Sequence, residues 1–156
     1  MDISEKVHIA RTSDSPEVLA KLAKDQSYCV RTTVAYNLHT PSEILSQLAK
    51  DQDEEVRGGV ARNPKTSSEQ LSDLATDKIA FVRIGVAENS STSAEILAEL
   101  AEDRTDFIRA QVADNSNTTI ETLSDLAKDQ DEEVRRTAEK NLSRKQAEDE
   151  SAEMSM

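Results

Sequence analysis

The stretch Thr40-Pro-Ser-Glu-Ile-Leu-Ser-Gln-Leu-Ala-Lys-Asp51, followed by Glu55-Val-Arg-Gly-Gly-Val-Ala-Arg-Asn63, decides the fold because variants of it recur along the chain. Asp51, Arg57 and Asn63 mark three positions that return every 26 residues, five times, without insertion or deletion. A fixed period of this length is typical of solenoid proteins, in which each repeat packs only on its neighbours. The sequence therefore predicts an array of five repeats rather than a globule around one central core.

The first half of each repeat predicts a short amphipathic helix. Thr40 stands three residues before Glu43, which is the spacing of a capping box at a helix N-terminus. Leu45 and Leu48 then lie on one stripe of the helix, with polar residues on the other faces. The same capping pair recurs as Asp14 with Glu17, Thr66 with Glu69, Thr92 with Glu95, and Thr118 with Glu121. Five copies in register make this a strong helix signal.

The second half of each repeat predicts a second helix. Val56 and Val60 stand four residues apart, so they share one helix face. Gly58 and Gly59 weaken the helix in this repeat because glycine is a poor helix former. Asn63 at the end suits a left-handed C-cap, a conformation that asparagine tolerates better than most residues do.

The repeats divide the chain into three parts. Residues 1–13 predict an N-terminal half-repeat that caps the first full layer, because Val7, Ile9 and Ala10 stand where a second helix would end. Residues 143–156 are polar, with several acids and few apolar side chains, and predict a disordered acidic tail. The five repeats between them are residues 14–39, 40–65, 66–91, 92–117 and 118–142.

The strings Glu-Val-Arg-x-x-Val-Ala-x-Asn and Thr-Pro-Ser-Glu-Ile-Leu-x-x-Leu-Ala-x-Asp, seen from about Val7 to Asn141, resemble the leucine-rich repeat variant family of bacteria. This resemblance implies an all-α, right-handed superhelix of paired short helices, one of them partly 3₁₀, without β-sheet. The founding type of the family carries an N-terminal cysteine cluster that binds an iron–sulfur centre. Here Cys29 stands alone, so we expect no cofactor.

An Asp and an Arg stand six residues apart in every repeat, as in HEAT repeats, where such a pair forms a ladder along the stack. We favour a structural ladder, since the planar guanidinium suits bidentate contacts, over a row of Arg side chains presented to an acidic partner. An Arg83→Ala change should then lower the melting temperature. The pairs are Asp25 and Arg31, Asp51 and Arg57, Asp77 and Arg83, Asp103 and Arg109, and Asp129 and Arg135.

Positions that vary between repeats are the better candidates for binding a partner. The variable positions of the second helices should line one continuous face. Tyr36 and Arg62 are its expected anchors, because aromatic residues and Arg dominate binding hot spots; an inert solvated surface is the alternative. The candidate residues are Tyr36, Arg62, Ile84, Glu88, Gln111 and Asp114.

The two Phe residues, Phe81 and Phe107, share one repeat position. We expect them to pack between layers, and an exposed patch for a partner is the alternative.

The charge and composition exclude several classes of function. A formal net charge of −12 argues against direct binding of nucleic acid, which requires a basic surface. The acidity serves solubility first, while mimicry of DNA phosphates and adaptation to high salt remain open. No apolar run reaches the length of about 18 residues that a membrane helix needs, and Met1–Lys6 lacks the apolar stretch of a signal peptide. We therefore expect a cytoplasmic protein.

The sequence predicts a non-catalytic protein–protein interaction module that is a monomer. His8, His39 and Cys29 show no arrangement typical of a catalytic site, so we expect no enzyme. The acidic clusters 51–55 and 129–133 lack the Gly turn and ligand spacing of a calcium loop, so we expect no metal. Two alternatives stay open: an acidic decoy that binds a DNA-binding protein, and a structural spacer or assembly element. The identity of the protein partner stays open as well.

Overall fold

The computed structural model describes residues 1–155, and these form eleven α-helices and no strand. They make up two compact units, one from Met1 to Ser91 and one that begins at Thr92. The division falls on the border between the predicted repeats 66–91 and 92–117. A division there is compatible with a repeat architecture, because the stabilising contacts of such a protein run only between neighbours.

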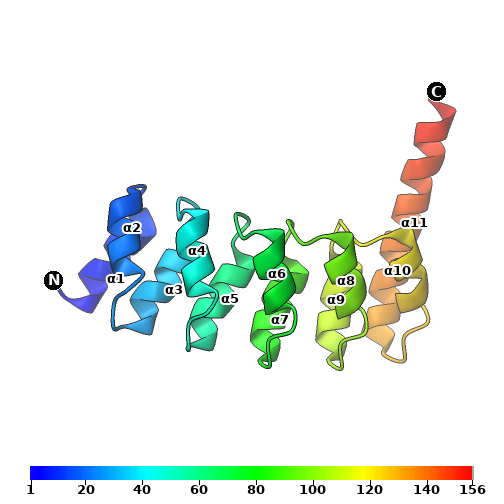
Figure 1. Ribbon diagram of the computed structural model, residues 1–156. Helices are drawn as coiled ribbons and strands as arrows, with labels where there is room; N and C mark the ends of the chain where they lie inside the picture. Colours follow the sequence, from blue (N-terminus) through cyan, green and yellow to red (C-terminus); the bar gives the residue numbers. More distant parts are fainter. Residues whose placement is uncertain (156) are drawn as a thin grey trace. The chain divides into compact units, whose positions relative to one another are not determined.

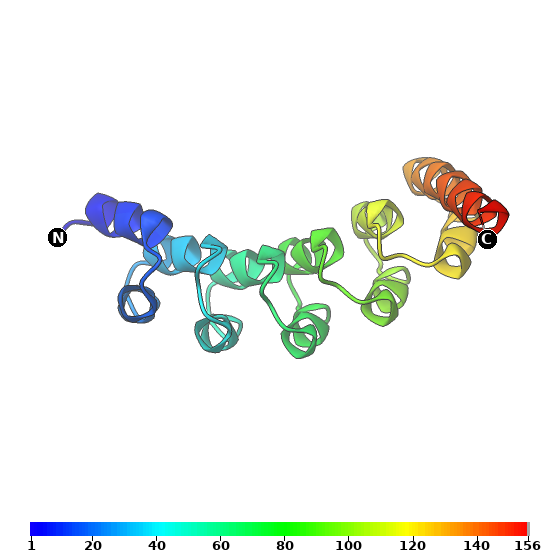
Figure 2. The same cartoon turned by 90° about the horizontal axis from the view of Figure 1, so that it is seen from above.

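The first unit contains two rows of helices (Figures 1 and 2). The first helix of each repeat lies in one row, and the second helices lie in the other, where each packs on the next. The first helices are α2 (Pro16–Leu22), α4 (Ser42–Leu48) and α6 (Ser68–Leu74), and the second helices are α3 (Tyr28–Tyr36), α5 (Glu54–Arg62) and α7 (Ala80–Glu88). The N-terminal helix α1 (Ile3–Thr12) packs on α3 and so occupies the place of a second helix ahead of the first full repeat.

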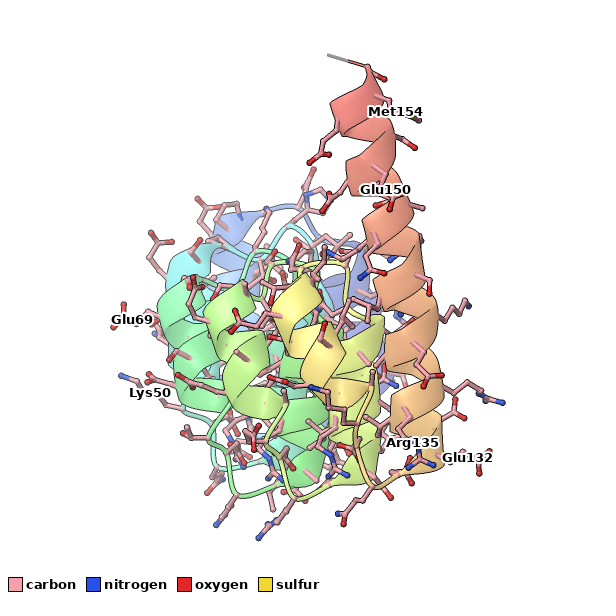
Figure 3. The ribbon with its side chains drawn as sticks, turned by 90° about the vertical axis from the view of Figure 1, so that its right-hand side faces the viewer. Lys50, Glu69, Glu132, Arg135, Glu150 and Met154 are labelled. Carbon is pink, nitrogen blue, oxygen red and sulfur yellow. The ribbon has the colours of Figure 1, made fainter. Side chains whose placement is uncertain are left out.

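The second unit repeats this pairing. Its first helices are α8 (Ala94–Leu100) and α10 (Ile120–Leu126), and its second helices are α9 (Asp106–Asp114) and α11 (Glu132–Met154), which pack on each other. Figure 3 shows Glu150 and Met154 on the part of α11 that projects beyond the helices packed against its first half.

The predicted apolar stripes form the core of both units. The first Leu of each stripe is completely buried: Leu19, Leu45, Leu71, Leu97 and Leu123. The valines of the second helices and Ile108 are equally buried, including Val56 and Val60 on either side of the glycine pair. Helix α5 runs through Gly58 and Gly59 without a break because both glycines are buried against neighbouring side chains. The prediction of an all-α repeat fold is confirmed.

The predicted capping boxes are wrong by one residue. The N-caps of the first helices are Ser15, Pro41, Ser67, Ser93 and Thr119, each one residue later than expected. The preceding threonines have another role: Thr40 and Thr66 are buried, and their hydroxyls donate to Val34 O and Val60 O, each at 2.6 Å. Sequence spacing cannot separate the two arrangements, because the carbonyl that the hydroxyl meets lies on the previous helix.

Two expectations about the helix ends are also corrected. The asparagines that end the second helices are extended, for example Asn63 with φ −74° and ψ 124°, and no described residue has a positive φ. Their side chains hydrogen-bond across to the preceding repeat, and this contact sets their backbone conformation. The partly 3₁₀ helix implied by the family resemblance is absent from the described residues, all of whose helices are α. Single i→i+3 bonds only close helix ends, as from Asn63 N to Val60 O at 3.0 Å.

The tail prediction is wrong for residues 143–154, because α11 continues as helix to Met154. The segment has no Pro or Gly and is rich in Glu, Ala, Lys, Arg and Gln, which are good helix formers. Extending a helix whose first half is already packed costs far less than starting one. Met156 lies outside the described residues. None of the described helices combines the length and apolar character needed to cross a membrane.

Candidate functional site

The Asp and Arg residues form links between consecutive repeats. Arg31 on α3 donates through Nε and Nη2 to both carboxylate oxygens of Asp51 in the next repeat, at 2.7 and 3.0 Å. Its Nη1 also donates to Asp25 O at 2.9 Å, which closes the loop of its own repeat. The Arg31 guanidinium therefore binds its own loop and the following carboxylate, and these contacts occupy it within the stack. Lys6 on α1 begins the series with an ion pair to Asp25 at 2.6 Å.

The same geometry continues further along each unit. Arg57 pairs with Asp77 at 2.7 Å in the first unit, and Arg109 pairs with Asp129 at 2.7 Å in the second. Arg83 is buried and donates to Asp77 O at 2.8 Å, and Arg135 donates to Asp129 O at 2.7 Å and Gln130 O at 2.8 Å. All these Arg side chains hold the loop that precedes their own helix.

The ladder stabilises the charged form of its carboxylates. Hydrogen bonds from the Arg109 guanidinium lower the pKa of Asp129, and the amide of Asp131 adds to this effect. Burial works to raise the pKa of Asp77, but the hydrogen bonds from Arg57 and from the amide of Ile79 outweigh it, so the pKa of Asp77 is lowered as well. The ion pairs therefore stay charged well below neutral pH.

A second ladder, of asparagines, was missed in the sequence. The side chain of Asn63 is buried and donates to Ala35 O at 2.8 Å and Asn37 O at 3.1 Å, while its Oδ1 accepts from the amide of Lys65 at 2.9 Å. One side chain thus satisfies three backbone groups at the joint between repeats. The exact return of Asn every 26 residues was the available signal. The corresponding residues Asn37, Asn89 and Asn141 donate to Ala10 O, Ala61 O and Ala113 O.

The face of the second helices in the first unit depends on glycines. A Cβ atom on Gly59 would lie 2.9 Å from Ala35 Cβ and 3.2 Å from the Tyr36 ring. A Cβ on Gly85 would lie 2.8 Å from Ala61 Cβ and 3.0 Å from Arg62 Nη1. The two glycines therefore let the Tyr36 and Arg62 side chains lie directly against the next helix, which explains why Gly is acceptable in these helices despite its low helix propensity.

Arg62 is held by its surroundings. Its Nε donates to Glu88 Oε2 at 3.0 Å, and its guanidinium lies over the Phe81 ring, 4.5 Å from the centroid. Phe81 in turn fills the space left by Gly58, where a Cβ would lie 2.3 Å from the ring. Arg62 and Glu88, both candidates for the binding face, thus form one cluster with Phe81 on α5 and α7. The expectation that Phe81 packs between layers agrees with this geometry.

The remaining candidate residues are distributed over both units. Ile84 is half-buried on α7 in the first unit, whereas Gln111 and Asp114 belong to α9 in the second. Asp114 is exposed and accepts from Asn141 Nδ2 at 3.4 Å. Phe107, also on α9, is 52% exposed, so the expectation of packing between layers is wrong for this residue.

Two large exposed apolar side chains lie close together where α3 ends. Tyr36 is 44% exposed, and Leu38, two residues later, is 60% exposed. Both line a hollow of about 420 Å³ between α1 and α3, whose other walls include Arg11, Thr33 and His39. The sequence did not point to Leu38, because it follows the last helical residue of the repeat. Its exposure became evident only from the structure.

The single cysteine lies outside the surfaces described above. Cys29, the single cysteine, is exposed at the start of α3, and a hydrogen bond with it raises the pKa of the neighbouring Tyr28. No three His, Cys, Asp or Glu side chains of the part that the structure describes are grouped as a metal site.

The geometry has counterparts among known proteins. The family model described as "Leucine rich repeat variant" matches residues 28–53, the length of one repeat. A solved structure described as a leucine-rich repeat variant with a novel repetitive structural motif has a TM-score of 0.70 and 28% sequence identity over 88% of this chain. The chain is similar to the leucine-rich repeat variant proteins. It spans 55% of that chain's length, a little over half.

Two other solved structures are similar to this chain in fold, at lower sequence identity. The Escherichia coli protein YibA has a TM-score of 0.60 and 23% identity, covering 86% of this chain and 57% of its own. An engineered protein has a TM-score of 0.50 and 19% identity, covering 89% of this chain and 86% of its own. No curated protein sequence matches the chain.

Proposed function

We propose that this chain is a non-catalytic protein-binding module, and that its binding surface is the end of the second-helix face formed by Tyr36 and Leu38. The observation that carries the proposal is the pair of large apolar side chains exposed beside the hollow between α1 and α3. Exposed apolar groups rimmed by polar residues are typical of protein interaction sites, and Tyr is among the residues that contribute most to such interfaces.

The internal contacts of the repeats support this choice of surface. The side chains that recur in every repeat, namely Asp, Arg and Asn, are used to join one repeat to the next. Arg62, the other expected anchor, is bound to Glu88 and covers Phe81. Tyr36 and Leu38, unlike Arg62, are therefore not held by a charged neighbour and remain available to a partner at the end of α3.

The repeat fold supports a preformed surface. Tyr36 lies against Gly59 of the next helix, and its backbone belongs to a helix whose neighbours on both sides are packed. A partner would meet a surface that loses little conformational freedom on binding, which favours affinity. The hollow is small, so one or two partner side chains would fill it.

The test is the capture of partners from native cells by the intact protein, by a Tyr36→Ala/Leu38→Ala variant and by a Phe107→Ala control. Phe107 is an equally exposed aromatic residue in the second unit. We expect one partner to be lost with the double variant and retained with the control. A partner retained by both variants, or lost with both, would refute this surface, provided that circular dichroism shows each variant folded.

A further inference from the structure

The second unit contains a groove that the proposed function does not use. It lies between the first helices α8 and α10, has a volume of about 770 Å³, and includes the small side chains of Ala94, Ala98 and Ala101 in its lining. These helices pack on second helices and make no substantial contact with each other, which leaves the space between them open.

The groove is strongly acidic. Six carboxylates and two guanidinium groups line it, and one of the guanidinium groups, that of Arg109, is already paired with Asp129 at 2.7 Å. Exposed carboxylates come from both walls, Glu95 and Glu102 from the side of α8 and Glu121 and Asp125 from α10. The excess negative charge therefore faces the open side of the groove.

Two of the groove's acidic residues are not required by the repeat, whereas Glu95 and Glu121 stand at a position that is Glu in every repeat. The position of Glu102 is occupied by Lys24, Lys50, Thr76 and Lys128 in the other four repeats. The position of Asp125 is occupied by Lys21 and Gln47 in the first two repeats and is acidic in the other three. The stack accepts basic or neutral side chains at these two positions, so its packing does not require the acidic side chains of Glu102 and Asp125.

We propose that the groove binds a short basic segment of a partner protein, whose Lys or Arg side chains meet Glu95, Glu102, Glu121 and Asp125. Complementary charge steers and orients such partners. The carboxylates of the described residues are not grouped closely enough to hold a metal ion. The exposed carboxylates lie on both walls of the groove, which suits a ligand with several separated positive charges. A seven-residue helix is about 10 Å long, which matches about three residues of extended chain.

The proposal is independent of the Tyr36 surface, because the two sites lie in different units and on different helices. The test measures the Kd of a fluorescent peptide, acetyl-Gly-Arg-Lys-Arg-Lys-Gly-amide, by anisotropy in low and physiological salt. The groove variant is Glu102→Lys/Asp125→Gln, whose new residues are those of the second repeat at the same positions, Lys50 and Gln47. The fold should therefore tolerate both changes.

The control variant is Asp73→Gln/Glu150→Lys, which changes the net charge by the same amount at exposed positions outside the groove. We expect the groove variant to weaken binding about tenfold and the control to weaken it less than about twofold. Equal weakening by both variants, or no binding to the unmodified protein, would overturn the proposal. Tighter binding of spermidine than of the peptide would also overturn it, because the groove would then be specific for polyamines.

Discussion

The two rows of helices are held in different ways. Second helices of one unit pack directly on each other, with Asn63 bound to carbonyls of the previous repeat and Gly85 admitting the Ala61 side chain. First helices are attached through their Leu stripes to second helices and make no substantial contact among themselves. Asn residues that recur without change hold the row of second helices together, whereas some outer positions of the first helices, such as that of Asp125, vary in charge. This difference separates what builds the stack from what is free to bind.

The largest loss of stability is expected when a first helix loses its apolar contact with the second helices. Leu74 on α6 is 3% exposed, and Leu74→Ala should lower the free energy of unfolding by about 2–5 kcal/mol because it leaves a cavity against the second helices. Urea denaturation followed by circular dichroism measures it. Leu74→Met, which nearly conserves volume, is the control and should cost less than about 1.5 kcal/mol. Equal losses would contradict the packing described for this row.

The next largest loss of stability is expected when the hydrogen bonds of Asn63 between second helices are removed. Asn63→Ala removes the partners of two carbonyls and one amide, and should destabilise the protein by about 2–3 kcal/mol. The control is Lys65→Ala, whose exposed side chain takes no part in the ladder although its amide does. A loss below about 1 kcal/mol for Asn63→Ala would show that water replaces the side chain without difficulty.

The Arg ladder offers a matched pair within the second unit. Arg109 donates to both a loop carbonyl and the Asp129 carboxylate, whereas Arg135 donates to two loop carbonyls. Arg109→Ala should cost about 2 kcal/mol and Arg135→Ala about 1 kcal/mol. The free energies of unfolding of both variants at neutral pH give the comparison. Identical costs would mean that the carboxylate adds nothing to the loop contact.

The same pair predicts a pH dependence. The pKa of Asp129 is lowered in the folded protein, so its contribution to stability is complete well above its ordinary value of 3.8 and is lost as the pH falls below that value. The stability difference between the unmodified protein and Arg109→Ala should therefore shrink on acidification through this range. Denaturation midpoints between pH 3 and pH 6 test it, with Arg135→Ala as control. A difference that stays constant with pH would rule out the linkage.

The smallest effect concerns the close approach of second helices. In Gly85→Ala the new Cβ would lie 2.8 Å from Ala61 Cβ, so α5 and α7 must move apart. This strain should outweigh the better helix propensity of Ala, for a net loss of about 1 kcal/mol. Thr33→Ala, at the same repeat position of the first repeat, should change stability by less than about 0.5 kcal/mol. A melting temperature raised by Gly85→Ala would contradict the packing argument.

The sequence determined the period, the helix pairs and the buried stripes, because a spacing of three and four residues, repeated five times, admits only amphipathic helices in a stack. It also pointed to the Asp and Arg pairs as structural, since they never vary. The cap positions could not be predicted, because Thr66 and Ser67 are equally good caps of α6 until the carbonyl of Val60 is placed. The helical continuation of α11 was missed because polar composition alone favoured disorder.

Only the tertiary structure decided which of the variable residues have side chains that are available to a binding partner. Arg62 is as polar as any surface residue, yet its position next to Glu88 and Phe81 binds it within the protein. Leu38 is apolar, yet it is exposed beside Tyr36. The acidic groove likewise combines residues from two helices that stand 26 residues apart in the chain. Local sequence sets which face of a helix is apolar, but the partner of each side chain belongs to another repeat, and its position follows from how the repeats stack.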